Sequence, residues 1–389
     1  MKESSSRRNF LTAGIGLPAA MALRPERREE TAPAYAEPSS RIELKYNILG
    51  RTKMKVTSVA FGCMVTSDPS VITKAADLGI NLFDTARGYQ NGNNERMVGE
   101  ALKGRRKDIY ISSKNPLATK KEALANLETS LKELNTDYLD IWYLHAKSKA
   151  TDITDEWLEA QAQAKKEGKI RFAGVSTHSG HADLVNGVLA HKDQIDVLLS
   201  SYNFTMSHTI DPVLESVSKA GLGIVGMKVM AGGFRKPKPG DKNYEILKRE
   251  GAMLAALKWV LRNPYINTTI PSITDMDQLD ENLKAMKEKF QEKDEKILAA
   301  QLEYIRPLYC RMCGSCSGTC AQGLPVSDMI RYLSYVEGYG QYSLGRESFR
   351  ELPEDLQARR CTDCTRCTVR CPNGVQVAQR VGRAQEIFA

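Results

Sequence analysis

Asn81-Leu-Phe-Asp-Thr-Ala-Arg-Gly-Tyr89 begins with apolar residues typical of a buried strand and continues with two polar groups, Asp84 and Tyr89. Two later stretches have the same form. Ile109-Tyr-Ile-Ser-Ser-Lys114 ends in a lysine, and Ile141-Trp-Tyr-Leu-His145 ends in a histidine. If the three runs are parallel strands of one sheet, their carboxyl ends meet at one edge, and we expect the four polar side chains to lie together there.

The four residues have the chemistry of a proton donor for a carbonyl group. A tyrosine phenol titrates near pH 10, so Tyr89 donates a proton poorly at neutral pH unless nearby cations stabilise the phenolate. Lys114 and His145 can be those cations, and an anionic Asp84 would keep the lysine charged and oriented. The set predicts general acid catalysis by Tyr89. The alternative is that all four are ordinary polar residues of a barrel rim.

Strand-like and helical runs alternate between about Arg41 and Gln301. Eight strand runs in roughly 250 residues predict an α/β fold, a parallel (β/α)8 TIM barrel, with its chemistry at the carboxyl ends of the strands. The expected strands are Val56–Phe61, Asn81–Phe83, Ile109–Ser112, Leu139–Leu144, Ile170–Val175, Val197–Ser200, Gly223–Gly226 and Thr268–Ile270. The expected helices include Lys120–Leu134, Thr154–Lys166, Ala182–Leu189 and Tyr244–Leu261.

A doubly wound sheet would alternate in the same way, but the chain has no dinucleotide fingerprint in the expected place. Gly221-Leu-Gly-Ile-Val-Gly226 has the glycine spacing of that fingerprint. These glycines precede and enter a strand, whereas the fingerprint leads from a strand into a helix. We interpret the segment as the end of a helix followed by a buried strand.

The order Asp84, Tyr89, Lys114, His145 resembles the aldo-keto reductase family, in which a D-T-A-x-x-Y motif is followed by Lys and His after the next two strands. All four positions match. The resemblance implies an enzyme that interconverts a carbonyl and an alcohol by hydride transfer with a nicotinamide cofactor. The substrate would be a small molecule, for example a sugar.

The same resemblance implies a set of cofactor-binding residues. Leu199, Met227 and Lys228 depart from the family pattern, since a glutamine and a nicotinamide-stacking tyrosine are expected there. Ser272 and Gln278 replace cations that often bind the 2′-phosphate, which weakens the case for NADP(H) over NAD(H). We still favour NADP(H). The positions assigned to the cofactor are Gly62, Ser176, Thr177, Lys228, Ser272, Gln278, Glu281 and Asn282.

The chain has nine cysteines, and eight of them form two runs of identical spacing, C-x2-C-x2-C-x3-C. This is the ferredoxin spacing, in which the fourth cysteine of each run usually serves the other cluster. It predicts two [4Fe–4S] clusters. Zinc and disulfides are the alternatives, although three cysteines at two-residue gaps cannot all pair locally without strain. The expected ligands are Cys310, Cys313, Cys316, Cys320, Cys361, Cys364, Cys367 and Cys371.

A helical stretch, Val326–Val336, separates the two runs by about forty residues. This arrangement resembles the helical ferredoxin domains of respiratory complexes more than compact two-cluster ferredoxins. Ala321 replaces the proline that follows the fourth cysteine in the second run. We therefore expect residues 1–36 to be a signal peptide, 41–300 the barrel, and 301–389 a small, mainly helical iron–sulfur domain.

The first thirty-six residues indicate export. Ser6-Arg7-Arg8-Asn9-Phe10-Leu11 matches the twin-arginine consensus, and Leu11–Leu23 is apolar but too short to span a bilayer. The twin-arginine machinery exports proteins already folded around their cofactors, which agrees with clusters assembled in the cytoplasm. We expect a periplasmic protein. Cleavage after Ala34-Tyr35-Ala36 or after Ala20-Met21-Ala22 is compatible with the sequence, and an uncleaved anchor on the outer face of the inner membrane is the alternative.

The net charge of +8 is modest and its basic residues are scattered, so we expect no binding to nucleic acid. An exported reductase could retain its nicotinamide and shuttle hydride, or its clusters could connect it to a redox protein partner. The alternative function is that of an iron–sulfur electron-transfer or binding protein whose barrel no longer performs nicotinamide chemistry.

Overall fold

The computed structural model describes residues 43–116, 119–206, 210–232, 239–240 and 251–389. Residues 42–389 form one compact unit. The expected signal peptide lies outside the described residues. So do 233–238 and 241–250, which include the first part of the expected helix Tyr244–Leu261.

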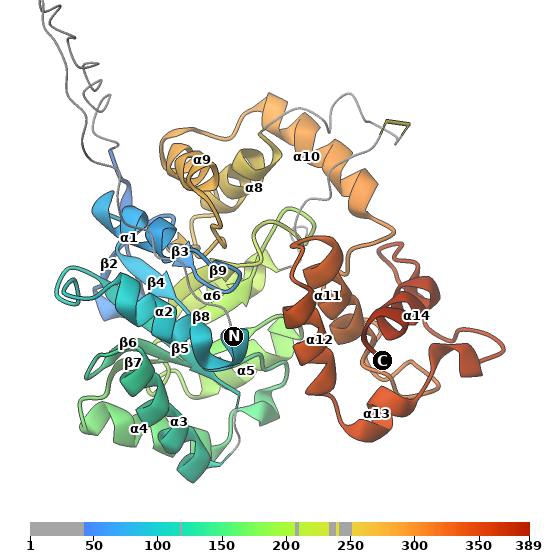
Figure 1. Cartoon of the computed structure of the whole chain (residues 1–389), viewed down its shortest axis with the longest axis horizontal. Coiled ribbons are helices and arrows are strands. Elements are labelled where there is room, and N and C mark those ends of the chain that lie inside the picture. Colours follow the sequence, from blue (N-terminus) through green and yellow to red (C-terminus); the bar gives the residue numbers. More distant parts are fainter. Residues whose placement is uncertain (1–42, 117–118, 207–209, 233–238, 241–250) are drawn as a thin grey trace, which may run out of the picture. The chain divides into compact units, whose positions relative to one another are not determined.

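Eight parallel strands form the predicted barrel, in which each strand pairs with the next along the chain (Figure 1). Bridges between Val59 and Thr269 and between Gly62 and Ser272 join the first strand to the last and close the sheet. The expected α/β fold and barrel are therefore confirmed. The strands are β3 (Phe61–Gly62), β4 (Leu82–Asp84), β5 (Tyr110–Asn115), β6 (Leu139–Leu144), β7 (Ile170–Thr177), β8 (Val197–Ser201), β9 (Gly223–Met227) and β10 (Thr268–Thr269).

The expected first strand, Val56–Phe61, is wrong as a single element. Val56 belongs to β2 (Lys55–Thr57), which pairs antiparallel with β1 (Tyr46–Ile48), and the barrel strand β3 begins only at Phe61. Leu49, Met54 and Val56 of this hairpin pack in one cluster with apolar residues of the barrel strands, such as Leu82 and Val197. Burial under the barrel explains why Val56 is apolar without being part of it.

Helices connect the strands and pack against the outside of the sheet, where they form the largest apolar core. Three of these helices, α1 (Pro69–Asp77), α3 (Lys120–Glu133) and α4 (Asp155–Lys166), are capped at their start. The side chains of Asp68, Thr119 and Thr154 accept hydrogen bonds from backbone N–H groups of the first turn. The helices of this region are α1 (Pro69–Asp77), α2 (Asn93–Ala101), α3 (Lys120–Glu133), α4 (Asp155–Lys166), α5 (His181–Ala190), α6 (Asp211–Lys219), α8 (Ala252–Leu261), α9 (Met276–Lys287) and α10 (Glu292–Ile305), with short 3-10 turns η1 (Gly50–Thr52), η2 (Tyr89–Gly92) and η3 (Ala150–Asp152).

The C-terminal region is helical and has its own apolar core. Helices α11 and α14 place Leu333, Val381 and Phe388 in this core, together with Phe349 of α12. The expected helix Val326–Val336 corresponds to α11. The helix α10 continues past the expected boundary at residue 300 as far as Ile305. The elements are α11 (Val326–Glu337), α12 (Tyr342–Arg350), α13 (Glu354–Ala358), η4 (Cys361–Asp363) and α14 (Val377–Phe388).

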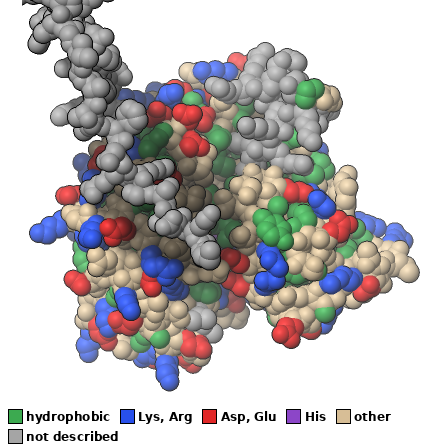
Figure 2. All heavy atoms as spheres, viewed as in Figure 1, with side chains coloured by type: hydrophobic (Ala, Val, Ile, Leu, Met, Phe, Trp, Pro, Cys, Tyr) green, Lys and Arg blue, Asp and Glu red, His purple; other side chains and the backbone are tan. Residues whose placement is uncertain are grey.

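Among the described residues, no helix combines the length and the apolar character that crossing a membrane would require. On the face shown in Figure 2, basic and acidic side chains alternate over the surface and no single-sign strip is formed.

Candidate active site

The four predicted catalytic residues lie at the carboxyl ends of three consecutive barrel strands. Asp84 ends β4, Lys114 lies near the end of β5, and His145 follows β6 directly. Tyr89 begins the turn η2 after β4. Because the strands are parallel and adjacent, these residues converge at one end of the barrel, as the sequence predicted.

Asp84 and Lys114 form a buried ion pair. Lys114 Nζ donates a hydrogen bond to Asp84 Oδ1 and a second, of 2.7 Å, to the carbonyl oxygen of Thr85. The hydroxyl of Ser112 donates to Asp84 Oδ2 at 2.6 Å. The side chains of Lys114 and Asp84 are only 1% and 3% exposed. Both charges are thus satisfied inside the protein, and the ammonium group has a fixed position.

Tyr89 lies between the lysine and the histidine. Lys114 Nζ is 5.0 Å from the centroid of the Tyr89 ring, and the Tyr89 and His145 rings meet edge to face at 6.1 Å. The three side chains therefore face one another. This arrangement suits proton donation by a phenol, because Lys114 is close enough to stabilise the phenolate that remains.

Residues with left-handed backbone conformations surround this site. Gln90 and Asn91 have φ values of 50° and 53° directly after Tyr89, Ala146 has 55° after His145, and Lys228 has 56° after β9. Non-glycine residues in this region of φ store strain, which the surrounding structure must hold. Four residues with such strained backbone lie at the end of the barrel that carries the quartet, which agrees with a functional site there.

The electrostatics of Tyr89 differ from the sequence-based expectation. Burial raises the pKa of Tyr89 to about 12, and the charge of Lys114 offsets this effect only in part. The expected acidification of the phenol by two cations is therefore wrong for this structure. Tyr89 is fully protonated at neutral pH, so the proton-donating form is the populated one.

Of the two expected cations, His145 is uncharged in this structure. Burial, followed by the charges of Lys114, Arg331 and Lys228, lowers the pKa of His145 well below its usual range. The imidazole is neutral at pH 7, and it can act as a hydrogen-bond donor but not as a charge. For Lys114, burial favours the neutral amine, but Asp84 and Tyr89 together raise the pKa above its usual value.

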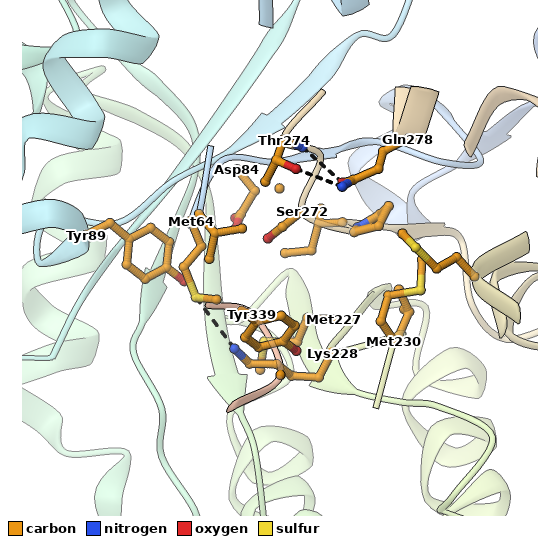
Figure 3. A pocket seen from close by; sticks show the side chains of 17 residues that line it. Met64, Asp84, Tyr89, Met227, Lys228, Met230, Ser272, Thr274, Gln278 and Tyr339 are labelled. Carbon is orange, nitrogen blue, oxygen red and sulfur yellow. Dashed lines mark hydrogen bonds between the residues drawn. The ribbon is translucent and has the colours of Figure 1, made fainter. Parts of the chain in front are cut away.

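A cavity of about 320 Å³ is lined by Asp84 and Tyr89 of this quartet, whereas Lys114 and His145 do not line it (Figure 3). Asp84 and Tyr89 lie at one end, and Ser272, Thr274 and Gln278 lie on one side. The size is at the lower limit of small-molecule sites, which span roughly 300–1,000 Å³. Most of the remaining lining is apolar and consists of Met64, Val65, Met227, Val229, Met230, Met253, Ile270 and Pro271.

Four of the predicted cofactor residues line the cavity: Gly62, Lys228, Ser272 and Gln278. Gly62 also has a packing reason to be glycine, because a Cβ atom there would lie 2.5 Å from the carbonyl oxygen of Ile270. Gln278 uses its side chain to cap the start of α9, where its amide nitrogen donates to Thr274 Oγ1 at 2.7 Å. These positions agree with a dinucleotide site along α9.

Asn282 lies one turn after Gln278 on the same face of α9. Its side chain is fully buried, and neither amide atom has a hydrogen-bond partner within the described part of the chain. Buried amides are rarely left unpaired. Neither Asn282 nor Glu281 lines the cavity described above. Glu281 accepts a hydrogen bond from the backbone of Leu254 at 3.3 Å.

Ser176 and Thr177 lie at the end of β7 but do not line the cavity. The Ser176 hydroxyl accepts a hydrogen bond from the backbone of Ala146 at 2.8 Å, and the Thr177 hydroxyl donates to the carbonyl oxygen of Ser179 at 2.6 Å. In this structure both hydroxyls support the loops that follow β6 and β7.

The C-terminal region contributes to this site, which the sequence did not predict. Gly338 and Tyr339 line the same cavity as Tyr89. Tyr335 of α11 accepts hydrogen bonds from Arg331 at 3.1 Å and from Lys228 of the barrel at 3.4 Å. Burial raises the pKa of Tyr335, but the charges of Arg331 and Lys228 outweigh burial and lower it. The local sequence around these tyrosines does not indicate that they contact the barrel.

The eight cysteines of the two runs form two groups. Each group combines the first three cysteines of one run with the fourth cysteine of the other. Three cysteines of the first run, Cys310, Cys313 and Cys316, line a small cavity together with Cys371 of the second run. Burial raises the pKa of Cys310 to about 12, with smaller contributions from the other three thiols.

The second group contains three cysteines of the second run and the last cysteine of the first. Burial and the neighbouring thiols of Cys367, Cys320 and Cys364 raise the pKa of Cys361. None of the cysteines, all of which are described, forms a disulfide. Within the described residues, no set of three or more His, Cys, Asp or Glu side chains converges as closely as a single metal ion needs.

The ninth cysteine, Cys63, is fully buried in the core between sheet and helices, and burial raises the pKa of its thiol.

Comparisons with known proteins agree with this barrel. The aldo/keto reductase family model matches residues 67–303. L-galactose dehydrogenase of Arabidopsis thaliana is 27% identical over 291 residues, which cover 64% of this chain and 89% of the relative. An aldo-keto reductase from Bacillus halodurans, solved in its holo form, is 28% identical with a TM-score of 0.56, over 67% of this chain and 97% of that one.

A second solved structure, an aldo-keto reductase from Klebsiella pneumoniae in complex with NADPH, shares the fold at 22% identity and a TM-score of 0.52, over 67% of this chain and 96% of that one. Because the family model covers more than half of the sequence, the chain belongs to the aldo/keto reductase family. It is an oxidoreductase of the aldo-keto reductase type. The matched residues end before the first cysteine run and therefore concern the barrel.

Proposed function

We propose that the protein reduces a carbonyl to an alcohol, and performs the reverse reaction, with a nicotinamide dinucleotide as hydride carrier. The observation that carries this proposal is the contact between Tyr89, Lys114 and His145 at the end of a cavity in the barrel. When bound, the nicotinamide supplies or accepts the hydride, and the protein supplies the proton and the positions of the reacting groups.

Each residue of the quartet has one task. The Tyr89 hydroxyl donates its proton to the carbonyl oxygen. The pKa of about 12 makes this phenol a weaker acid than a free tyrosine, but the transfer still runs downhill because the alkoxide that forms is a stronger base than the phenolate. Neutral His145 donates a hydrogen bond that orients the same oxygen. Lys114, held by Asp84, stabilises the phenolate that remains until solvent returns a proton to it.

The cavity supports NADP(H) or NAD(H) as the cofactor. Its polar side runs along Ser272 and Gln278 to the start of α9, where the positive end of the helix dipole favours a phosphate. Asn282, with its unpaired buried amide, would bind the adenine end. We favour NADP(H), in line with the NADPH-bound relative from Klebsiella pneumoniae. Asp275, the N-cap of α9, carries a negative charge that would repel a nearby 2′-phosphate. NAD(H), which lacks this phosphate, is therefore the alternative.

The substrate that we propose is a small hydroxy-carbonyl compound such as a sugar. The related L-galactose dehydrogenase supports this class by its name. The cavity also has polar groups at its reacting end and apolar walls beyond it, which is the usual composition of a small-molecule site.

We further propose that the two cysteine groups hold two [4Fe–4S] clusters with crossed fourth ligands. The grouping of Cys371 with the first run supports this arrangement. The backbone N–H of Met312 lies 3.3 Å from the sulfur of Cys310, and the amide of Asn373 lies 3.4 Å from that of Cys313. Such N–H groups favour cluster thiolates. Zinc fits less well, because four thiolates around one ion must converge closely.

Export by the twin-arginine machinery to the periplasm remains part of the proposal and depends on Arg7 and Arg8. A redox protein partner for the clusters is compatible with it. The main alternative is an iron–sulfur electron-transfer or binding protein with an inactive barrel, and the replacement of an expected aromatic by Met227 in the cavity favours that alternative.

The decisive experiment is to denature the purified full-length protein and identify the released small molecules by mass spectrometry. In parallel, the oxidation of NADPH and of NADH is followed by absorbance with DL-glyceraldehyde as a probe carbonyl. We expect a released nicotinamide dinucleotide or aldehyde-dependent oxidation of one of the two. Absence of both, with no binding of either nucleotide, would contradict the proposal and favour an inactive barrel.

A further inference from the structure

The C-terminal region forms one wall of the cavity in the barrel. Helix α11 ends at Glu337, and the two residues that follow, Gly338 and Tyr339, line the cavity together with Asp84 and Tyr89. Figure 3 shows the Tyr339 ring beside Met227 and Lys228, on the side of the cavity opposite Asp84 and Ser272. A residue far from the barrel in sequence therefore faces the reaction site.

Backbone contact fixes the position of this wall. A Cβ atom added to Gly338 would collide with the carbonyl oxygen of Gly232 in the loop after β9, so the two segments touch without an intervening side chain. The backbone N–H of Gly232 also donates a hydrogen bond to the Tyr339 hydroxyl. The hydroxyl and the preceding residue are thus both held against the barrel.

The orientation of the Tyr339 ring is fixed by a second tyrosine. Tyr335 and Tyr339 stack with their centroids 6.0 Å apart and an angle of 28° between the rings. Tyr335 is buried and held by Arg331 and by Lys228 of the barrel, whose Nζ lies 4.8 Å from the Tyr335 ring centroid. The face of Tyr339 is therefore part of an ordered wall.

Among the residues that the structure describes, two aromatic rings line this cavity, Tyr89 and Tyr339. Tyr89 must present its hydroxyl to the substrate. In the described part of the chain, the barrel wall next to Tyr339 consists of the flexible side chains of Met227, Lys228 and Met230, which offer no planar surface. A nicotinamide ring is flat and, when oxidised, cationic, and both properties favour an aromatic face.

We propose that Tyr339 is the surface on which the nicotinamide ring packs, so that the C-terminal region completes the cofactor site and restricts cofactor release. The inference rests on the proposed function and adds the residue and the domain that hold the ring. A cofactor that packs on Tyr339 would lie between the barrel and residues 338–339, and we expect it to leave faster when these residues separate from Gly232. Slow release would suit an enzyme that works away from the cytoplasmic nucleotide pool.

The first test is the affinity of the full-length, cluster-containing protein for NADPH and NADH, titrated by nicotinamide fluorescence. Tyr339→Leu should weaken binding about 2- to 10-fold, the range expected for one aromatic contact. Tyr339→Phe, which keeps the ring, should retain the affinity of the wild type. Tyr342→Leu is the matched control, because Tyr342 is 47% exposed on α12 and should have no effect.

The second test is the rate of cofactor release, measured by stopped-flow displacement of NADPH with excess NADP+. Gly338→Ala should increase this rate by tenfold or more, since its methyl group would collide with the carbonyl oxygen of Gly232 and force the two segments apart. Gly382→Ala on α14, where a Cβ atom meets no other atom within 4 Å, should leave the rate unchanged.

The two proposals fail in different ways. If the wild type binds a nicotinamide nucleotide but Tyr339→Leu binds it equally well and Gly338→Ala releases it at the same rate, the role of Tyr339 is wrong and the proposed function stands. If the wild type binds neither nucleotide and carries none after purification, the proposed function itself is wrong.

Discussion

The barrel end and the cysteine region are two polar sites built on different principles. In the barrel, Asp84 and Lys114 are almost completely buried and pair with each other, and their positions follow from the ladder of parallel strands. In the C-terminal region, most of the cysteines are half-buried and lie on irregular segments, such as residues 310–325, without helix or strand. None of these thiols takes part in a disulfide bond.

This difference shows which site is preorganised. The barrel quartet keeps its geometry without any ligand, because backbone hydrogen bonds and a buried ion pair hold each member. The cysteine groups can reach a low energy as thiolates only when a metal centre neutralises them. We expect substitutions in the barrel site to change catalysis with little effect on the fold. Substitutions of the cysteines should first change what the C-terminal region binds.

The largest effect should come from Tyr89→Phe, which removes the proton donor and keeps the ring. General acid catalysis contributes roughly 10²- to 10⁴-fold, so the rate of carbonyl reduction should fall by about that factor. Nucleotide binding should change little. The measurement is steady-state reduction of the best carbonyl substrate, with Tyr46→Phe on the exposed hairpin strand β1 as the control. Unchanged turnover in Tyr89→Phe would exclude Tyr89 as the acid. The barrel end would then not be the preorganised catalytic site that we contrast with the cysteine region.

The next effect concerns the crossed grouping of the cysteines. Cys371→Ser should lose about half of the iron, since it would remove one of two clusters. If Cys371 shares a cluster with Cys313, the double substitution of both should lose no more iron than either alone. Combining Cys371→Ser with Cys364→Ser should remove both clusters.

Iron content and the electron paramagnetic resonance spectrum of the reduced protein measure this effect. Cys63→Ala, in the barrel core, is the control that should keep both clusters. A loss of both clusters from Cys371→Ser combined with Cys313→Ser, but not from Cys371→Ser combined with Cys364→Ser, would show that each run binds its own cluster. Protein without iron would argue for another metal.

The smallest effect should be a pH dependence of stability at the boundary of the two regions. Burial, followed by the charges of Arg331 and Lys228, lowers the pKa of His178 well below its usual range. Below about pH 6.5 the unfolded chain binds a proton at His178 that the folded protein excludes, so stability falls as the pH falls. Between pH 6.5 and 5.5 this histidine should lower the free energy of unfolding by about 1 kcal/mol.

His178→Gln should therefore lose less stability over this pH step than the wild type. Urea unfolding followed by tryptophan fluorescence measures the barrel selectively, because all three tryptophans, Trp142, Trp157 and Trp259, lie in it. His191→Gln, at the C-cap of α5, is the control and should behave like the wild type. An identical acid slope in wild type and His178→Gln would show that the barrel does not exclude a proton there.

Much of the barrel could be predicted from the sequence. Each expected strand from Asn81–Phe83 onward overlaps an observed one, because a buried parallel strand is a short apolar run bounded by turns and its signal is local. The expected helix Lys120–Leu134 ends within one residue of α3. The strand Val56–Phe61 was wrong because an apolar run does not distinguish a barrel strand from a hairpin buried beneath the barrel.

The sequence by itself determined the quartet, since the order and spacing of Asp84, Tyr89, Lys114 and His145 place them after successive strands, and alternation of strands and helices leaves few topologies. It also determined the cysteine spacing. Only the tertiary structure decided that Tyr335 and Tyr339 reach the barrel, that Cys371 joins the first run, and that the pKa of Tyr89 rises. The physical reason is that strands and helices depend on neighbouring residues, whereas burial, desolvation and close packing depend on residues that the chain brings together from far apart.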